Sequence, residues 1–277
     1  MDLSVYELAA FFFIYGFLGW CTEVCFQALS KGKLVNRGFL NGAICPIYGV
    51  GVVSVVWLLE PLASHGLALF FASIVLCSLL EWITGFVLEK LFHQKWWDYS
   101  DEPFNIGGYI CPRFSIMWGF ACVFVVYIVH PTIAWLASLV PHTLGIVLLS
   151  LLGAAFITDC AATVKTMIGF NRELRRIDEG AAKLKEISDD LTEALYEGAV
   201  RAREEAEKAR EETEEFKAKV SAEKAQLEIR RKELEKKLTY GQRRLLKAFP
   251  GVKSTRHIEA MEEMKRRLDE YIKTNRR

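Results

Sequence analysis

Long apolar runs alternate with short polar segments over the first 168 residues of the chain. Each run holds about 20 residues, roughly the length that an α-helix needs to cross a bilayer. The pattern predicts five membrane-spanning helices, at Leu8–Leu29, Gly42–Leu62, Leu67–Leu88, Phe114–Leu136 and Thr143–Ile168. The first run has no basic segment before it and carries a tryptophan and a glutamate where signal-peptide cleavage needs small residues, so we interpret it as a retained span.

The pattern changes after residue 168. From Asn171 to about Tyr240 the chain has no proline, is rich in Ala, Glu, Lys, Arg and Leu, and repeats its apolar residues mostly at steps of three and four. Such spacing favours a long helix over 169–240 that forms a coiled coil with itself or with a partner, and a single charged helix stabilised by i,i+4 pairs is the alternative. Pro250 interrupts the pattern, and a helical, hairpin-like segment is predicted over 241–277.

Charge divides the chain near the same place. Residues 1–165 hold seven Lys and Arg against ten Asp and Glu, whereas the remaining 112 residues hold 28 against 24. Within the membrane part, the basic residues gather in the predicted connections 30–39 and 90–113. By the positive-inside rule, the N-terminus lies outside the plasma membrane and the tail lies in the cytoplasm. The predicted fold is therefore all-α, a polytopic membrane helix bundle over 1–168 followed by a cytoplasmic helical tail.

One segment of the membrane part occurs twice. FLNGAICPIYG (39–49) and FNIGGYICPRFSIMWG (104–119) share a Phe, a Gly and an Ile-Cys-Pro, with one inserted residue. Each copy follows a predicted span with a single carboxylate and precedes a new span that begins at the proline, a residue tolerated in the first turn of a helix. We interpret the bundle as two parallel hairpin repeats plus one helix, a plan that places a site at the repeat interface. Chance similarity between glycine-rich apolar segments is the alternative.

The two carboxylates inside the spans, Glu23 and Glu81, are the first candidates for a site. A charged side chain at the centre of a bilayer costs about 2.5–3.5 kcal/mol on insertion scales, so it normally faces a partner or a wet cavity. Both lie near a connection that carries an arginine, Arg37 or Arg113. Ion pairs that lock the hairpins together are one interpretation, and a substrate or proton pathway is the other. Asp159 in the fifth span is a weaker third candidate.

The same connections supply the remaining candidates. Asn36, Asn105 and Asp98 complete the predicted substrate or ion pathway as polar residues of the same two connections. Tryptophan and tyrosine side chains are enriched at the level of lipid headgroups. The second connection contains three of these residues, which we predict to be interfacial anchors: Trp96, Trp97 and Tyr99.

Several classes of function have no matching motif. The sequence contains no GxxxxGK[ST] segment, no nucleophile elbow and no HExxH segment. The seven cysteines lie in or beside the predicted spans, where cysteine packs as a small apolar residue, and they show no metal-ligand spacing. Basic clusters in the tail are interspersed with acids, which does not favour nucleic acid as a partner. We expect no enzyme activity, no cofactor and no metal.

Four segments together resemble a known family: GWCTEV, VNRGFLNGAICPIYG, LLEWITGFVLEKLF and WWDYSDEPFNIGGYICPRFSIMWG. With the five-span layout, they are similar to the putative ABC-transporter type IV family, bacterial membrane proteins usually labelled ABC transporter permeases. The resemblance covers about residues 8–140, and its mixed motifs NRGFLxGxxCPIYG and WWDYS are fairly specific. It implies a location in the bacterial plasma membrane.

The expected function follows from this resemblance and from the missing nucleotide-binding motif. The chain is expected to be the membrane subunit of an ABC-type transport system, with a separate ATP-binding subunit as its partner. Five spans are few for a pore, so a homo-oligomer or a hetero-partner is expected too. The alternative is a membrane-anchored interaction scaffold or sensor that acts through its coiled coil. A membrane enzyme that acts on a lipid headgroup is a distant third.

Overall fold

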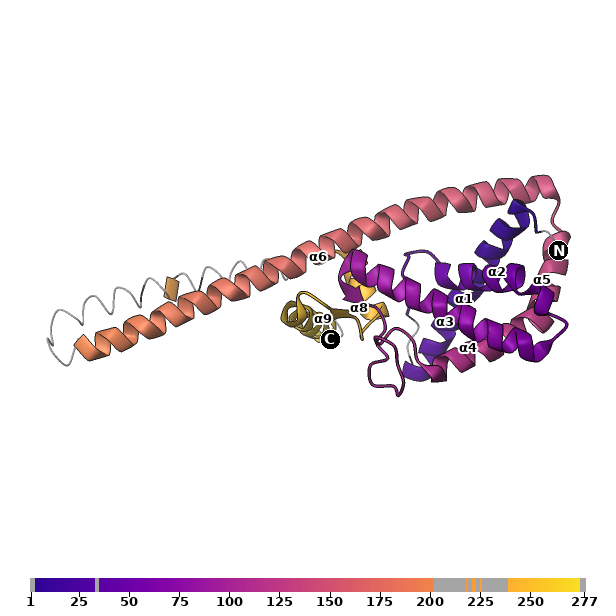
Figure 1. The fold of residues 1–277 in the computed structure, drawn as a ribbon. Helices are drawn as coiled ribbons and strands as arrows, with labels where there is room; N and C mark the ends of the chain where they lie inside the picture. Colours follow the sequence, from indigo (N-terminus) through magenta and orange to yellow (C-terminus); the bar gives the residue numbers. More distant parts are fainter. Residues whose placement is uncertain are drawn as a thin grey trace. The chain divides into compact units, whose positions relative to one another are not determined.

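The computed structural model describes residues 3–32, 35–201 and 239–274, together with the isolated positions 218, 221, 222 and 225. It is 77% helical, which confirms the all-α class. The chain divides into two compact units (Figure 1). The first unit combines Met1–Ile168 with Arg244–Arg256, and the second combines Gly169–Arg243 with His257–Arg277.

The first unit is built from helices that follow one another with short connections. Its elements are α1 (Val5–Lys31), α2 (Pro46–Leu58), the 3-10 turn η1 (Glu60–Leu62), α3 (Gly66–Phe92), β1 (Gln94–Lys95), α4 (Pro112–Phe124), the π-turn η2 (Val125–Val129), α5 (His130–Ser138), the first part of α6 (His142–Arg201), the end of α8 (Tyr240–Ala248) and β2 (Lys253–Ser254). We call residues 35–45 the first loop, residues 93–111 the second loop, and Arg244–Arg256 the return segment.

Local sequence explains where these helices begin. The Ser4 hydroxyl accepts a hydrogen bond from the Glu7 amide, and the Glu7 carboxylate accepts one from the Ser4 amide, so α1 starts with a capping box. Helices α2 and α4 both start at a proline that follows an extended cysteine, Cys45 or Cys111. Proline fits there because the first helical N–H has no intrahelical acceptor. The predicted helix starts at the two Cys-Pro dipeptides are confirmed.

Within the part of the chain that the structure describes, four helical stretches are long and apolar enough to cross a bilayer: Val5–Leu29, Gly66–Phe92, Pro112–Ser138 and His142–Asp190. The third is continuous because a π-turn joins α4 to α5. Helix α2 has only 13 residues, about 20 Å of helix against a hydrocarbon core of about 30 Å. The second predicted span was Gly42–Leu62, so its helix is shorter than expected and the count of five spans stays a prediction. The length and composition of these apolar helices fit a membrane protein.

Helix α3 has one buried face and one apolar exposed face. Leu69, Ser73, Glu81 and Gly85 are buried and repeat at multiples of four residues. On another face Phe71, Val75, Leu79 and Ile83 are exposed at the same spacing. An apolar stripe of this kind is expected of a helix that faces lipid. Glu81 is therefore turned away from that stripe and toward neighbouring helices.

Glycines let the helices pack closely in pairs. In the first hairpin, α1 packs on α2, and a Cβ at Gly19 would lie 2.3 Å from the Tyr48 ring. In the second, α3 packs on α4, and a Cβ at Gly119 would lie 2.7 Å from the Ile74 side chain. Helix α2 also contacts α3, so the two hairpins adjoin.

The second unit holds the rest of α6 and α9 (Ile258–Thr274). The buried side chains of α9 are apolar (Ala260, Met261, Met264 and Leu268), and Phe170 and Leu174 of α6 are buried too. The His257 ring bonds to Asp178 within this unit. Residues 169–201 are helical, as the tail pattern predicts. Most of the predicted coiled coil, 202–238, lies outside the described residues apart from the four isolated positions, so that prediction stays untested.

Candidate functional site

The first carboxylate, Glu23 on α1, has a phenol and a guanidinium as partners. The Tyr48 hydroxyl of α2 donates to Glu23 Oε1 at 2.7 Å. Arg37 Nε of the first loop lies 3.6 Å from Glu23 Oε2. Arg37 Nη1 also donates to Gln27 Oε1 at 3.2 Å, one turn further along α1. The structure thus brings Glu23 and Arg37 together, and the charge of the carboxylate is compensated.

The second carboxylate, Glu81 on α3, has no such cation among the residues that the structure describes. Its side chain is 8% exposed. The Tyr99 hydroxyl of the second loop donates to Glu81 Oε1 at 3.1 Å, and the Trp118 indole of α4 lies against the carboxyl group. Oε2 is buried, and no described residue makes a hydrogen bond of ordinary geometry with it. Arg113 does not approach it.

Arg113 instead points toward water. Its Nη1 donates to Glu102 Oε1 at 3.0 Å, and the Arg113 side chain is 74% exposed. It follows Pro112 directly, in the first turn of α4, whereas Arg37 precedes the corresponding proline by nine residues. The two arginines therefore occupy different places in the two hairpins.

Aromatic rings connect the two carboxylates. The Tyr48 and Trp118 rings have centroids 5.7 Å apart, and the Tyr99 and Phe114 rings are stacked at 4.6 Å. Burial raises the pKa of the Tyr99 phenol, and the negative charges of Glu81 and Glu23 raise it further. Both carboxylates thus lie close enough to act on one ring. We call this group the carboxylate cluster: Glu23, Tyr48, Glu81, Tyr99, Phe114 and Trp118.

Two predicted pathway residues organise the loops. Asn36 Oδ1 accepts from Trp20 Nε1 at 2.7 Å and from the Gly38 amide at 3.0 Å. Asn105 Oδ1 accepts from the Gly108 amide at 3.0 Å, while its Nδ2 donates to the Ser100 and Glu102 carbonyls. The contacts of both amides are local, and they set the conformation of the first and the second loop. Their role in a pathway stays a prediction.

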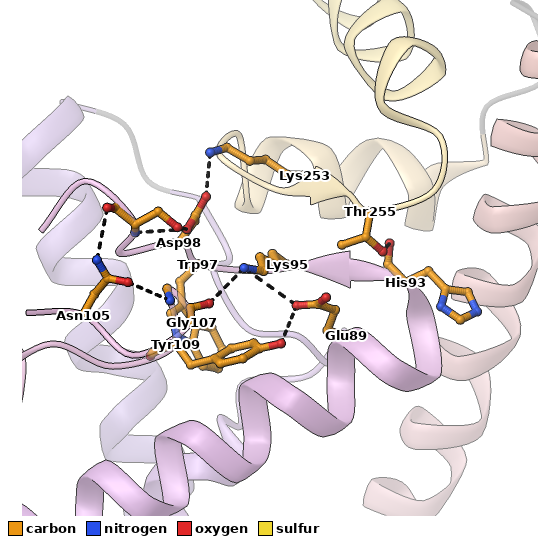
Figure 2. Close-up of polar contacts among 12 residues, drawn as sticks. Glu89, His93, Lys95, Trp97, Asp98, Asn105, Gly107, Tyr109, Lys253 and Thr255 are labelled. Carbon is orange, nitrogen blue, oxygen red and sulfur yellow. Dashed lines mark hydrogen bonds and ion pairs between the residues drawn. The ribbon is translucent and has the colours of Figure 1, made fainter.

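Asp98 closes a turn in the second loop and is also paired with the return segment (Figure 2). Its Oδ1 accepts from the Ser100 amide and hydroxyl, and its Oδ2 accepts from Lys253 Nζ at 2.6 Å. Partial burial opposes ionisation of Asp98, but the hydrogen bonds from Lys253 and Ser100 outweigh it and lower the pKa to about 2. Gly108 has φ +73°, and a Cβ there would lie 2.6 Å from Asp98 Oδ1, so this turn requires glycine.

A second set of contacts ties the loop to the end of α3. Figure 2 shows Lys95 between the Gly107 carbonyl and Glu89, with Nζ 3.0 Å from the carbonyl and 4.0 Å from the carboxylate. The Tyr109 hydroxyl donates to Glu89 Oε2 at 2.7 Å, and Trp97 Nε1 donates to the Tyr109 carbonyl at 2.9 Å. Glu89 thus has defined partners beside the helix end.

The three predicted interfacial anchors have partners inside the first unit. Trp96 is buried, and its ring makes edge contacts with Phe39 of the first loop and Phe249 of the return segment. Trp97 and Tyr99 use their polar atoms in the contacts described above. These contacts hold the loop in place, and the anchoring role at the lipid headgroups stays a prediction.

The return segment was missed by the sequence analysis. Arg244 donates from Nη1 to the Gly38 carbonyl at 2.8 Å and from Nη2 to the Phe39 carbonyl at 2.9 Å. Strand β2 pairs antiparallel with β1, and the Thr255 amide donates to the His93 carbonyl at 2.9 Å. The segment therefore contacts both loops. The sequence feature that could have indicated this segment is short. It consists of an arginine followed by Phe249 and Val252, which flank a Pro-Gly turn.

Asp159, the weaker third candidate, fastens α6 to the first loop. Its two carboxylate oxygens accept from the Asn41 amide at 3.1 Å, the Asn41 side chain at 2.8 Å and the Gly42 amide at 2.7 Å. These contacts occupy the loop amides just before α2. They give Asp159 a clear structural role.

Comparison with known proteins gives one family. The family model described as putative ABC-transporter type IV matches residues 10–164, which include the whole carboxylate cluster and both loops. No curated protein and no solved structure matches the sequence significantly. The matched region covers more than half of the chain, so the chain belongs to the putative ABC-transporter type IV family and is a transporter-related membrane protein.

Proposed function

We propose that this chain is the permease-like membrane subunit of an ABC-type transport system, with ATP hydrolysis supplied by a separate chain. It lies in the bacterial plasma membrane with its N-terminus outside and its tail in the cytoplasm, and it has no enzymatic activity of its own. The family match supports the transport role. The sequence has no P-loop, so the ATPase has to be another protein.

The observation that carries the proposal is the carboxylate cluster. Two carboxylates, one from each hairpin, are turned toward neighbouring helices and share aromatic neighbours. Ionisable groups inside membrane helices are costly and usually mark substrate or ion pathways. Transporters built from repeats place their sites at the repeat interface. If the two hairpins are such repeats, these carboxylates are the groups that would line the site.

Co-purification tests the partner. A tagged chain, extracted from its native membrane in mild detergent, should bring down a protein with Walker motifs in near-equal amount. Adding ATP and Mg²⁺ to that complex should give hydrolysis that the isolated chain lacks. A preparation that retains its fold and captures no P-loop protein, with or without ATP, would refute the ABC-type assignment.

Paired variants test the cluster. Glu23→Gln and Glu81→Gln should keep the abundance of the protein and abolish transport-dependent growth or uptake, whereas Asp101→Asn at an exposed loop position is the matched control. If activity falls only in proportion to abundance, the carboxylates are structural and the pathway role is wrong.

A scaffold or sensor function is the second candidate. One observation favours it: α6 continues to Arg201, 33 residues past the end of the membrane part at Ile168. Truncation after Asn171 would also remove the return segment, so it does not isolate the tail. Replacing 202–238 by a Gly/Ser linker keeps Arg244–Arg256. Retained transport with that linker favours the permease, and complete loss of function in a normally inserted protein favours the scaffold.

A further inference from the structure

The partly buried Glu23 and the buried Glu81 differ in one respect that has chemical consequences. Glu23 faces a guanidinium, since Arg37 Nε lies 3.6 Å away. Among the described residues, no Lys, Arg or His forms an ion pair with Glu81, although its side chain is more deeply buried. An opposite charge nearby keeps a carboxyl ionised, whereas burial without one favours the neutral acid.

The surroundings of Glu81 are mostly neutral. Tyr99 Oη donates to its Oε1, the Trp118 indole lies against the carboxyl group, and the Cys77 thiol lies one turn earlier on α3. Glu23 and Glu81 both act on the Tyr99 phenol, so the charge on the far side of Tyr99 is negative. An ionised Glu81 would have the Tyr99 hydroxyl and the Trp118 indole as its donors and no cation among the described residues.

We propose that Glu81 is a proton-binding site that takes up and releases one proton as the neutral acid and the carboxylate exchange, while Glu23 stays ionised against Arg37. The proton adds to Oε2, the buried oxygen without a hydrogen-bond partner among the described residues. This inference rests on the proposed transport function and deepens it by assigning one protonation step to the carboxylate cluster, beside the ATP hydrolysis that the separate chain supplies. Proton binding itself can be measured without transport.

A metal cation is a poorer occupant than a proton. Hard cations take about six or more oxygen ligands, and Glu81 has one phenol, one indole and thiols nearby. A proton needs no further ligands. Its binding removes the charge that makes a buried carboxylate costly.

The second loop sets the position of the only hydroxyl that bonds to Glu81 among the described residues. The Tyr99 amide donates to the Gly108 carbonyl at 2.9 Å, directly beside the Asp98 turn. A rearrangement of that turn would withdraw the Tyr99 hydroxyl and change the balance between the acid and the carboxylate. Tyr99 is thus a positioning residue for the proton site.

An apolar carbodiimide tests the proposal, because it reacts with protonated carboxyl groups in apolar surroundings. The full-length protein in neutral lipid nanodiscs is treated with dicyclohexylcarbodiimide over a pH series, and adducts are mapped by mass spectrometry. Labelling should occur at Glu81 and decline as the pH rises. At the pH of maximal labelling it should exceed labelling of Glu23 about tenfold, which corresponds to about 1.4 kcal/mol. Equal labelling of the two residues would overturn the proposal.

Matched variants keep the test decisive. Arg37→Met should make Glu23 reactive and leave Glu81 unchanged, which a merely structural role for Arg37 would not predict. Tyr99→Phe removes a hydrogen bond that favours the carboxylate, so labelling of Glu81 should extend to higher pH. Glu81→Gln should remove the adduct while thermal unfolding stays unchanged or improves.

A second measurement covers the case in which the reagent cannot reach the site. The infrared carbonyl band of a protonated carboxylic acid should appear as the pH is lowered and be missing in Glu81→Gln but present in Glu23→Gln. A band that is unaffected by Glu81→Gln refutes the proton site. If Glu81 is protonated but no ATPase co-purifies, only the ABC-type assignment is refuted. If an ATPase co-purifies but Glu81 stays ionised at every pH, only the proton site is refuted.

Discussion

The two hairpins of the membrane part place one carboxylate each beside a tyrosine hydroxyl, yet within the described ranges an arginine pairs with the first carboxylate and none with the second. Their tyrosines come from different places, since Tyr48 follows Pro46 within α2 and Tyr99 lies in the longer second loop. At the position of Tyr48, the second copy has Phe114, which stacks on Tyr99. A repeated sequence can thus preserve helix starts and a carboxylate while the loops change the charge balance around it.

The tightest packing in the first hairpin gives the largest expected effect. In Gly19→Ala the new Cβ would lie 2.3–2.4 Å from Cγ and Cβ of Tyr48, atoms at the base of the side chain that cannot move aside easily. Overpacking costs about 1–3 kcal/mol, and we expect a value near the upper end together with displacement of Tyr48 from Glu23. The midpoint of thermal unfolding in detergent measures it.

Two further glycine-to-alanine variants serve as comparisons, one in the second hairpin and one at an open position. Gly119→Ala would meet Cγ1 of Ile74 at 2.7 Å and the ring edge of Phe70 at 2.8 Å. These distances are longer than those to Tyr48, and a side-chain rotation can move the atoms, so we expect about 1 kcal/mol. Gly51→Ala meets nothing within 4 Å and should be neutral or stabilising. If Gly119→Ala were more harmful than Gly19→Ala, this account of the two interfaces would be wrong.

Removing the arginine of the first hairpin should also cost more stability than removing the arginine of the second. Arg37→Ala leaves the partly buried Glu23 without its cation and removes the hydrogen bond from the charged guanidinium to Gln27, a kind of bond that contributes about 1.5–3 kcal/mol. Arg113→Ala removes an exposed pair with Glu102, which contributes about 0–1 kcal/mol. Double-mutant cycles of Arg37 with Glu23 and of Arg113 with Glu102 measure both coupling energies. Equal coupling energies for the two pairs would mean that the different placement of the arginines does not affect stability.

The return segment can be loosened from the first loop alone. Arg244→Ala leaves the Gly38 and Phe39 carbonyls without their donors, and we expect a loss of about 1–2 kcal/mol. Limited proteolysis of the segment in nanodiscs should become faster. Lys247→Ala, at an exposed position of the same helix, is the control and should leave cleavage unchanged.

The contact with the second loop should have the smallest effect and a defined pH dependence. Lys253 is exposed, so Lys253→Met should cost about 0–1 kcal/mol. The pKa of Asp98 is lowered to about 2, so its stabilising contribution is complete above the ordinary value of about 3.9 and is lost as the pH falls toward 2. Hydrogen exchange of residues 249–256, corrected for intrinsic rates, should be flat at neutral pH and rise in acid. In Asp98→Asn the acid-dependent rise should vanish.

Local features of the fold were predictable from the sequence, and contacts between distant segments were not. The helix starts at Pro46 and Pro112 follow from a local rule. The hydropathy pattern overestimated the length of the second helix. It carries no information on the hydrogen bond from the Gly42 amide to Asp159, which holds the residues before Pro46 in a loop. Tyr48, Tyr99 and Trp118 could not be assigned to the carboxylates, since those contacts join segments that no periodic pattern relates.

Assembly of the first unit during synthesis has to wait for its last part. Roughly 75 residues, Gly169–Arg243, separate the end of its apolar helices from Arg244 in sequence. At about 5–20 residues per second, a ribosome needs on the order of 4–15 s to make them. Throughout that interval β1 has no strand to pair with, and Trp96 lacks the Phe249 ring. A nascent chain that is already inserted therefore presents two unfinished loops to chaperones and proteases, and a premature stop anywhere before residue 244 would leave those loops uncovered permanently.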